Sequence, residues 1–468
     1  MKIKIVNFGP LKEFEFDLSK RFIAIYGNNN IGKSYSMQAV YLLLKTFIGF
    51  RNSSAVLVNG QPYPGRSMSA HDIGEILQKL LRSFVETDMA EKDITNEVRQ
   101  ILHESISEMF MPHFMNACGN TFGNFQKLLE KNPHIYLEYK EYHLDIDLAE
   151  EKVEGDTELL PVRLKKTESN MYASRKGSAH FDIYVYHKEM QRPIEVLFNW
   201  VSQLLSKMIY KLTWEFSQVY FLPAPRSGIY SGMNAFGAIV AELSRNRAVL
   251  TRKIELPGLS EPISDYFISL SNIANLPNVK LKNAGGLGEY CAKIEDTILK
   301  GKVQFDKGRN ALIYVPDDLD TAFEMTEVSS MVSEVSPIVA FLKYIMSSRR
   351  RTVRNNAILF IEEPEAHLHP ANQVKLVEIF AELISEDVTL VMSSHSNYVF
   401  NKLNNLVLSK KLDYHNYQPV FLEEGDGGSR SRVLPIDECG ADDENFMDVS
   451  EELYQEREAI IQNFNLGE

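Results

Sequence analysis

The feature that most constrains this sequence is the segment Gly27–Ser34, with the letters G-N-N-N-I-G-K-S. It matches the phosphate-binding pattern G-x-x-x-x-G-K-[ST] in full. The apolar run Phe22–Tyr26 precedes it and predicts a buried strand, and helical spacing of apolar residues from Met37 to Phe47 predicts a helix after it. A strand, a glycine loop and a helix in this order predict an α/β fold with a nucleotide site at the loop.

Each residue type in this loop has a physical task. Gly27 and Gly32 let the backbone bend closely around phosphate oxygens, so that successive N–H groups point inward. Lys33 reaches the outer phosphates, and the Ser34 hydroxyl can ligate Mg²⁺. The following helix places its positive end at the phosphates. We therefore expect the whole loop to bind nucleotide, through Gly27, Asn28, Asn29, Asn30, Ile31, Gly32, Lys33 and Ser34.

A second segment supplies acidic residues. The run 357–361 is apolar throughout, as in a strand buried on both faces of a parallel sheet, and it ends in Glu362 and Glu363 before a proline. Carboxylates at the C-terminal end of such a strand lie where open α/β sheets bind ligands. A further buried strand, predicted over 388–392, ends at S-S-H-S with His395. A histidine at that height can hydrogen-bond a γ-phosphate or the attacking water.

The separation of these motifs decides between classes of nucleotide-binding fold. Residues 35–357 lie between the loop and the acids, whereas kinases, small GTPases and AAA+ motors place the acid motif much sooner. We therefore expect a core split by a large insertion. Residues 1–50 and 326–468 would form the two halves of the core, and residues 51–325 would form a mixed insertion of helices and strands. No heptad pattern persists over several turns, so we expect a globular insertion rather than a coiled-coil arm.

Periodicity predicts both kinds of element in the insertion. Helical spacing of apolar residues covers 73–84, 94–110 and 196–209. Strand patterns cover 137–139, 144–148 and 181–186, and a hairpin is predicted from 303–305 and 312–315.

Two further segments present polar residues near predicted element ends. In V-Y-F-L-P-A-P-R-S-G, residues 219–228, a strand breaks into a proline loop that carries Arg226. This arginine could face a phosphate or a neighbouring subunit, or it could pair with a surface acid, and the sequence leaves these alternatives open. In T-E-V-S-S-M-V-S-E-V-S-P, residues 326–337, hydroxyl residues precede an apolar helix. They could bind a γ-phosphate held by a second molecule, or they could form an ordinary N-cap.

Composition restricts the class of protein. The chain has 468 residues, 44% of them hydrophobic and 24% charged, which is typical of a soluble globular protein with two or three domains. Three distant cysteines, no signal-like start and no membrane-length apolar run lead us to expect a cytoplasmic protein. A net charge of −13 disfavours polyanion binding by the whole surface. The densest basic run, Arg349–Arg351 with Arg354, could contact nucleic acid, although a solvated or acid-paired loop is favoured.

The combined motifs resemble those of ABC-class ATPases of the SMC/RecF/OLD (overcoming lysogenisation defect) group. V-N-F-G-P-L-K-E-F-E-F-D-L with G-N-N-N-I-G-K-S looks like their N-terminus, and I-E-E-P-E-A-H-L-H-P looks like the Walker B motif and D-loop of the OLD branch. S-S-M-V-S-E resembles the signature motif, and S-S-H-S resembles the switch-histidine loop. The resemblance covers roughly residues 1–50 and 325–400, and F-L-P-A-P-R-S-G carries it in the insertion.

This resemblance implies ATP as ligand and a catalytic role for each matching residue. Glu363 would be the general base, His395 would sense the γ-phosphate, and Lys33 would bind the outer phosphates. Mg²⁺ would be held by Ser34 and by Glu362, which stands where many relatives have Asp. Its longer arm suggests a water-mediated metal contact.

The resemblance also implies that a second subunit completes the site. Ser329 and Ser330 would contact ATP across a dimer interface. Met331 stands where relatives usually have Gly, and a side chain there would crowd the approach of the backbone to phosphate, so we expect slow or partner-dependent hydrolysis. His367 and His369 could be taken for a zinc pair, but the resemblance places them in the D-loop at the interface.

A biological role follows from the same resemblance. Full-length OLD proteins carry a C-terminal Toprim nuclease, but residues 396–468 are too few for that domain in addition to the remaining core strands. The architecture resembles more closely the stand-alone ATPase subunits of anti-phage systems that encode a separate nuclease. Of these systems, PARIS matches the length of this chain better than Septu does. We therefore expect a homo-oligomeric, ATP-dependent scaffold that holds an effector nuclease until a phage protein or DNA is sensed. Two alternatives stay open: a RecF-like repair ATPase that clamps DNA as an ATP-bound dimer, and a self-sufficient nuclease.

Overall fold

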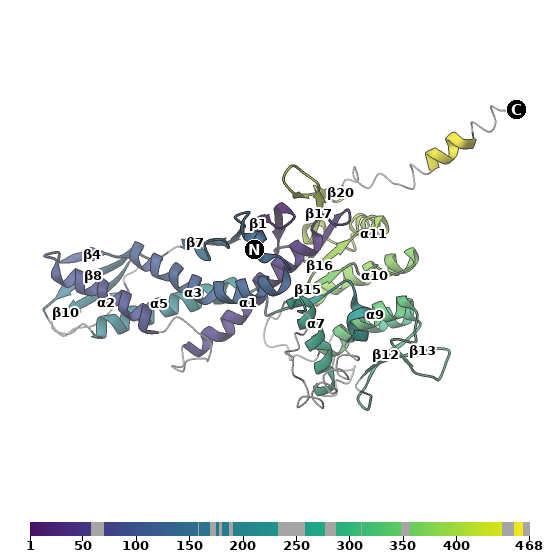
Figure 1. Cartoon of the computed structure of the whole chain (residues 1–468), viewed down its shortest axis with the longest axis horizontal. Helices are drawn as coiled ribbons and strands as arrows, with labels where there is room; N and C mark the ends of the chain where they lie inside the picture. The colour runs from purple at the N-terminus through teal and green to yellow at the C-terminus, as the bar shows by residue number, and fades with distance from the viewer. Residues whose placement is uncertain are drawn as a thin grey trace, which may run out of the picture.

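The computed structural model describes residues 1–57, 70–157, 159–168, 175–176, 180–186, 191–232, 258–276, 287–309, 311–347, 356–441 and 454–461. Figure 1 shows an elongated molecule, in which a lobe of helices and a small sheet on the left joins a broader body on the right. Across these residues, no helix has both the length and the apolar character that crossing a lipid bilayer requires.

The body is organised around one large mixed sheet. Within the described residues the sheet has eleven strands, in the order β11-β15-β16-β3-β17-β18-β2-β1-β5-β6-β7. The first five in this order run parallel: β11 (Gln218–Leu222), β15 (Ala357–Glu362), β16 (Val388–Ser394), β3 (Phe22–Gly27) and β17 (Tyr417–Glu423). The strands expected from apolar runs are β3, β15 and β16, and nearly all of their residues are buried. The predicted α/β fold class is confirmed.

The other six strands extend the sheet beyond β17. They are β18 (Ser429–Val433), β2 (Leu11–Asp17), β1 (Lys2–Phe8), β5 (His134–Tyr139), β6 (Tyr142–Asp147) and β7 (Lys152–Thr157). β18 pairs antiparallel with β17 and parallel with β2, and the remaining pairs are antiparallel. Strands β11 and β5 to β7 come from residues 51–325, so this segment contributes to the same sheet as β3. The division of the chain into three parts stays a prediction.

Alternation along the central strands divides the interior into two cores. Ile358 and Phe360 of β15 belong to one core and Leu359 and Ile361 to the other, because successive strand residues point to opposite faces. The first core is covered by α1 (Lys33–Leu57), α3 (Thr95–Thr121) and α5 (Gln191–Leu212). The second is covered by α7 (Glu261–Ser271), α8 (Leu287–Ile294), α9 (Ser330–Ala340), α10 (Pro370–Leu383) and α11 (Asn397–Leu408), with the π-helical turns η3 (Glu295–Leu299) and η4 (Phe341–Met346).

The lobe contains a second, smaller sheet and helix α2. The sheet has the order β4-β8-β10-β9, with β4 (Glu91–Asp93), β8 (Val162–Thr167), β10 (Phe181–Tyr186) and β9 (Arg175–Lys176), and α2 (Ala70–Glu86) lies beside it in Figure 1.

The helices predicted within 73–84, 94–110 and 196–209 are α2, α3 and α5, so all three are confirmed. The predicted strands are β5, β6 and β10. The predicted hairpin is β12 (Gly301–Asp306) with β13 (Ala311–Pro316), and β14 (Phe323–Glu324) pairs with β13.

Shorter elements complete the described chain. They are α4 (Phe125–Leu129), η1 (Asn272–Asn275), η5 (Ile384–Glu386), η6 (Tyr414–Asn416), β19 (Ile436–Asp437) and β20 (Gly440–Ala441).

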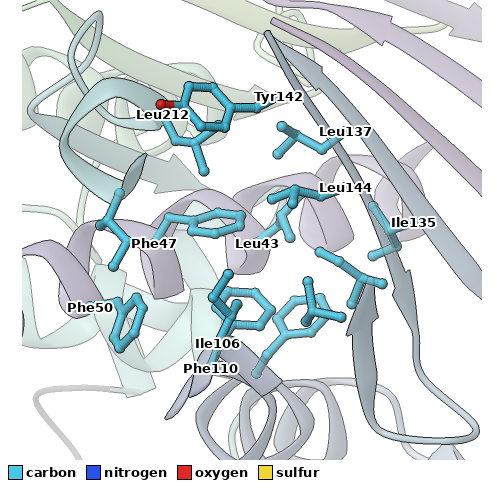
Figure 2. Close-up of a cluster of buried hydrophobic side chains, with 14 of the residues drawn as sticks. Leu43, Phe47, Phe50, Ile106, Phe110, Ile135, Leu137, Tyr142, Leu144 and Leu212 are labelled. Carbon is cyan, nitrogen blue, oxygen red and sulfur yellow. The ribbon is translucent and has the colours of Figure 1, made fainter. Parts of the chain in front are cut away.

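Figure 2 shows how the first core joins α1 to the antiparallel part of the sheet. Leu43 and Phe47 of α1 lie between Phe110 of α3 and the apolar side chains of β5 and β6. The rings of Phe47 and Phe110 stack with their centroids 4.6 Å apart. Because α1 follows the glycine loop directly, packing in this cluster also holds the loop in place.

Replacing Phe47 by Ala should destabilise the fold, because Phe47 is only 2% exposed and its ring stacks on that of Phe110. Such changes cost about 3–5 kcal/mol of unfolding free energy. Thermal melting, followed by circular dichroism, should show a clearly lower midpoint for Phe47→Ala. The matched control is Ile268→Ala, whose side chain is 54% exposed, with an expected change within about 0.5 kcal/mol. Equal midpoints for both variants would contradict the assigned packing.

Candidate active site

The predicted site lies where parallel strands end side by side. In the sheet register, Glu362 of β15 is opposite Ser393 of β16, and Ser394 is opposite Tyr26 of β3. The glycine loop therefore begins one strand away from the histidine loop and two strands away from the acid pair. Ligands of open α/β sheets bind at the carboxyl ends of the strands, and this edge brings together residues from both ends of the sequence.

The glycine loop needs its glycines for two separate reasons. Gly27 and Gly32 have φ angles of 141° and 103°, which strain any residue with a side chain. A Cβ on Gly27 would also lie 2.7 Å from the carbonyl oxygen of Leu422, and one on Gly32 would lie 2.9 Å from Leu11. Asn28, Asn29 and Asn30 are exposed, whereas Ile31 and Gly32 are buried. Helix α1 begins at Lys33, so its N-terminus lies at the loop, as expected for a phosphate site.

Lys33 lies inside the loop rather than in solvent. Its side chain is largely buried, and Nζ donates to the carbonyl oxygens of Gly27 at 2.8 Å and Asn28 at 2.7 Å. Burial lowers the pKa of Lys33 to about 8, while the nearby carboxylates of Glu363 and Glu365 raise it. Lys33 is therefore a cation whose protonation depends on the negative charge around it.

A hydrogen-bonded chain joins this lysine to the predicted base. Lys33 Nζ lies 3.3 Å from Nδ1 of His395, and Nε2 of His395 lies 3.2 Å from Oε1 of Glu363. Ammonium only donates and carboxylate accepts, so a neutral imidazole with its proton on Nε2 satisfies both contacts. The hydrogen bond from His395 lowers the pKa of Glu363, with smaller contributions from the positive charges of Lys33 and Arg226. Glu363 is thus held as a carboxylate.

The backbone of Glu363 adopts a conformation that is unfavourable for a residue with a side chain. Its φ angle is 43°, in the left-handed region. Its N–H donates to the carbonyl oxygen of Ser393 at 3.1 Å. Non-glycine residues in this region are concentrated at functional sites, where the surrounding structure holds them in place. The turn separates the side chain of Glu363 from that of Glu362 and directs it at His395.

Glu362 and Ser34 form an oxygen-rich pair beside the loop. A hydrogen bond with Ser34 stabilises the Glu362 carboxylate, which also accepts from the backbone N–H of Ala224 at 3.2 Å and from Gln38 at 3.5 Å. Burial raises the pKa of Glu362, and the bond with Ser34 opposes that rise. A hydroxyl and a carboxylate in contact are the protein oxygens that Mg²⁺ typically uses together with phosphates and water. The residues present therefore fit Mg²⁺.

No group of three or more His, Cys, Asp or Glu side chains in the described ranges could hold a metal by itself. A bound Mg²⁺ would accordingly take most of its ligands from phosphate and water. His367 and His369 are both exposed, and His369 Nδ1 accepts from the N–H of Ala371 at the start of α10.

Sequence reasoning missed Glu365, the third acid of E-E-P-E. Its side chain is buried, and Oε1 accepts from the hydroxyl of Ser394 at 2.6 Å and from the N–H of His395 at 2.9 Å. Burial raises the pKa of Glu365, and these two hydrogen bonds lower it. Glu365 therefore positions the histidine loop. Gln38 was missed as well, although its place four residues after Ser34 on one helix face was a usable signal.

Arg226 differs from both alternatives that the sequence left open. Its side chain is fully buried, so it is neither a surface ion pair nor an exposed group presented to a neighbour. It pairs with the buried Glu334 of α9, with Nε 3.4 Å from Oε2. The sequence offered no sign of this, because the two residues are far apart in the chain.

The signature segment forms the start of α9. Ser329 and Ser330 are exposed, and the Ser329 hydroxyl accepts from the N–H of Val332, so it is the N-cap. Met331 does not extend from the helix start: its sulfur lies 3.5 Å from the side-chain nitrogen of Asn372 on α10. Contact of both serines with ATP in a second subunit stays a prediction. Arg349, Arg350, Arg351 and Arg354 lie outside the described residues.

The pKa of Lys33 predicts how nucleotide affinity depends on pH. Phosphate binds the protonated lysine, so affinity should be full below the pKa of about 8 and should decrease as the pH rises through it. Titration of the protein with a fluorescent ATP analogue on both sides of this pH should show the loss. Lys33→Ala should bind weakly at every pH without that step. A wild-type affinity unchanged across the range would contradict the assigned environment of Lys33.

The chain was compared with solved structures and with curated protein sequences. Two solved structures are similar: an SmcHead bound to the C-winged helix domain of ScpA, at 10% identity and a TM-score of 0.36, covering 93% of this chain and 97% of that one; and the SMC head domain from Thermotoga maritima, at 9% identity and a TM-score of 0.33, covering 93% and 98%. Neither likeness is close enough to bear on function. Curated protein sequences yield no match.

The family match is more extensive. The sequence family described as the AAA ATPase domain matches residues 1–166 and 253–400, more than half of the chain. The first segment contains the glycine loop, and the second contains the signature segment, the acid pair and the histidine loop. Both halves of the site therefore fall within the matched residues, and the chain belongs to the AAA ATPase domain family.

Proposed function

We propose that the chain binds ATP with Mg²⁺ at Gly27–Ser34 and hydrolyses it, with Glu363 as general base. The observation that carries this proposal is the contact of Glu363 with His395, and of His395 with Lys33. These contacts bring a carboxylate, an imidazole and a lysine ammonium together at the strand ends, which supports the proposal. Positioning and charge stabilisation account for most of the catalysis in phosphoryl transfer, and these groups supply both.

Each side chain has a task in this reaction. Glu363 accepts the proton of the attacking water, and His395 orients Glu363 while facing the terminal phosphate. Lys33 exchanges its contacts with the loop carbonyls for phosphate oxygens, which return its pKa toward the usual range. Ser34 and Glu362 would hold Mg²⁺, which, when bound, neutralises charge on the phosphate oxygens.

Glu363→Gln tests the base directly. The amide keeps the size of the side chain and can still contact His395, but it cannot accept the proton of water. We expect ATP binding to be retained and turnover to fall by about 10²–10⁴-fold. Phosphate release under saturating ATP measures turnover, and the exposed Asp318→Asn, in a loop after β13, serves as a charge-matched control with unchanged rate. Normal turnover by Glu363→Gln would remove Glu363 from the role of base.

We further propose that two copies form the complete site, with Ser329 and Ser330 of each copy facing the nucleotide of the other. The exposure of both serines at the start of α9 supports this arrangement, since no residue in the described part of the chain covers them there. The inward direction of Met331 also supports it, because the methionine leaves the helix start open to phosphate. The crowding expected from Met331 is correspondingly reduced.

In the cell, we propose that the chain is the sensor and scaffold subunit of an anti-phage complex, which holds a separate effector nuclease and releases it when a phage protein or DNA is sensed. The motif resemblance to OLD-like ATPase subunits supports this role. The net charge of −13 also supports it, because an acidic surface suits the binding of a basic nuclease away from nucleic acid.

DNA binding separates this role from that of a DNA-clamping repair ATPase. With ATP and the Glu363→Gln variant, a clamp would bind duplex DNA tightly at low salt and lose affinity steeply as salt rises. We expect no such ATP-dependent binding by the isolated chain in a filter-binding titration at two salt concentrations. Tight, salt-sensitive binding would favour the repair role instead.

A further inference from the structure

Arg226 occupies the joint between the acid strand and the signature helix. Among the described residues it is the largest fully buried side chain, and its guanidinium donates to four carbonyl oxygens. The η1 nitrogen donates to Glu362 at 2.7 Å and to Pro223 at 3.1 Å, the η2 nitrogen donates to Glu363 at 3.1 Å, and Nε donates to Glu334 at 3.2 Å. One side chain thus links the loop after β11, the end of β15 and helix α9.

Two of these carbonyls determine the conformation of the candidate base. The oxygens of Glu362 and Glu363 belong to the two peptide groups on either side of the Glu363 Cα. Fixing both peptide planes fixes the backbone dihedrals of Glu363, including its left-handed φ of 43°. The direction of the side chain toward His395 follows from those dihedrals.

Only an arginine can make this set of contacts. Its guanidinium carries five N–H donors in a planar, rigid fork and stays charged when buried, whereas the lysine ammonium is a compact point charge. Glu334 supplies the compensating charge and is itself only 4% exposed. Ser227 follows Arg226 in the chain, and its N–H and hydroxyl both donate to Oε1 of Glu334 and hold this carboxylate in place. The other carboxylate oxygen, Oε2 of Glu334, is buried without a hydrogen bond and faces Nε of Arg226 at 3.4 Å, so the ion pair is its contact there.

We propose that Arg226 is a positioning residue for ATP hydrolysis: it holds the backbone of Glu363 so that the carboxylate faces His395, and through Glu334 it couples this geometry to helix α9. The inference rests on the proposed function, since it assumes that Glu363 is the base. The proposal predicts that a change at Arg226 lowers the turnover rate but not the affinity for ATP. In the described hydrogen bonds and ion pairs, Arg226 contacts none of the residues of the glycine loop.

The first test is Arg226→Lys, which keeps the charge and loses the fork. ATP affinity should stay within about threefold of wild type, and kcat should fall about 10²-fold, since small displacements of a catalytic group cost that much. A fall in kcat with unchanged KM indicates an interaction that matters in the transition state and not in ground-state binding. A purely structural role would reduce the amount of folded protein and leave kcat per active molecule unchanged.

The second test keeps the fold without the arginine. In the double variant Arg226→Met with Glu334→Met, apolar side chains replace a buried ion pair, a change that proteins often tolerate. We expect it to fold and bind ATP, with kcat as low as in Arg226→Lys. The matched control is Lys343→Met with Glu295→Met, which removes another buried ion pair, with Nζ and Oε1 3.0 Å apart, on the π-helical turns η4 and η3. It should keep the wild-type kcat.

The outcomes are distinct. Wild-type kcat in either folded Arg226 variant would overturn the positioning role, as would parallel loss of ATP affinity and kcat. An equal fall of kcat in the control pair would assign the effect to general packing and overturn it too. A wild-type chain that binds ATP without hydrolysing it would overturn the proposed function, and this inference with it.

Discussion

The parallel pairing of β15, β16 and β3 is the constraint on which the site depends. Its register sets Glu362 opposite Ser393 and Ser394 opposite Tyr26, so three chain segments leave the sheet at the same height. In parallel strands a slip of one residue would turn each strand-end side chain to the other face of the sheet. Both cores resist such a slip, because β15 and β16 bury large apolar side chains on each face. Apolar packing thereby specifies the positions of polar groups that it does not touch.

Several ionisable side chains are buried together at this edge of the sheet, although burial of charged groups is unfavourable by itself. Glu362 and Glu365 are buried carboxylates whose pKa values are raised by burial, and the largely buried Lys33 has its pKa lowered. Each group nevertheless has at least one hydrogen-bond partner, which is a backbone N–H, a hydroxyl or a carbonyl. Buried polar groups are costly unless paired, so this edge is stable only as a connected network. Under the proposed function, phosphate and metal would replace some of the internal contacts of this network.

The parts of this site that are contiguous in sequence could be predicted, and those assembled from distant segments could not. The glycine loop, the acid pair and His395 each follow an apolar run, and a strand end is a local signal. Glu365 and Gln38 were near such signals and were overlooked. The pairing of Arg226 with Glu334 has no local signal, because residues more than a hundred positions apart meet only after the sheet forms. The membership of β5 and β6 in the central sheet was hidden for the same reason, since alternation predicts a strand but not the strand that pairs with it.

The position of Arg226 gives the long separation between the two motifs a physical consequence. The strand β11 and its proline loop come from the segment between the glycine loop and the acid pair, yet β11 pairs directly with β15. Its loop supplies the N–H of Ala224 to the Glu362 carboxylate and Arg226 to the carbonyls behind Glu363. The acid end of β15 therefore lacks two of its supports unless this intervening segment is folded. Helix α5 of the lobe leads directly into β11, so one strand and one turn connect the lobe to the acid pair. The separation of the motifs therefore has a structural role, since the segment between them carries the backbone support of Glu362 and Glu363.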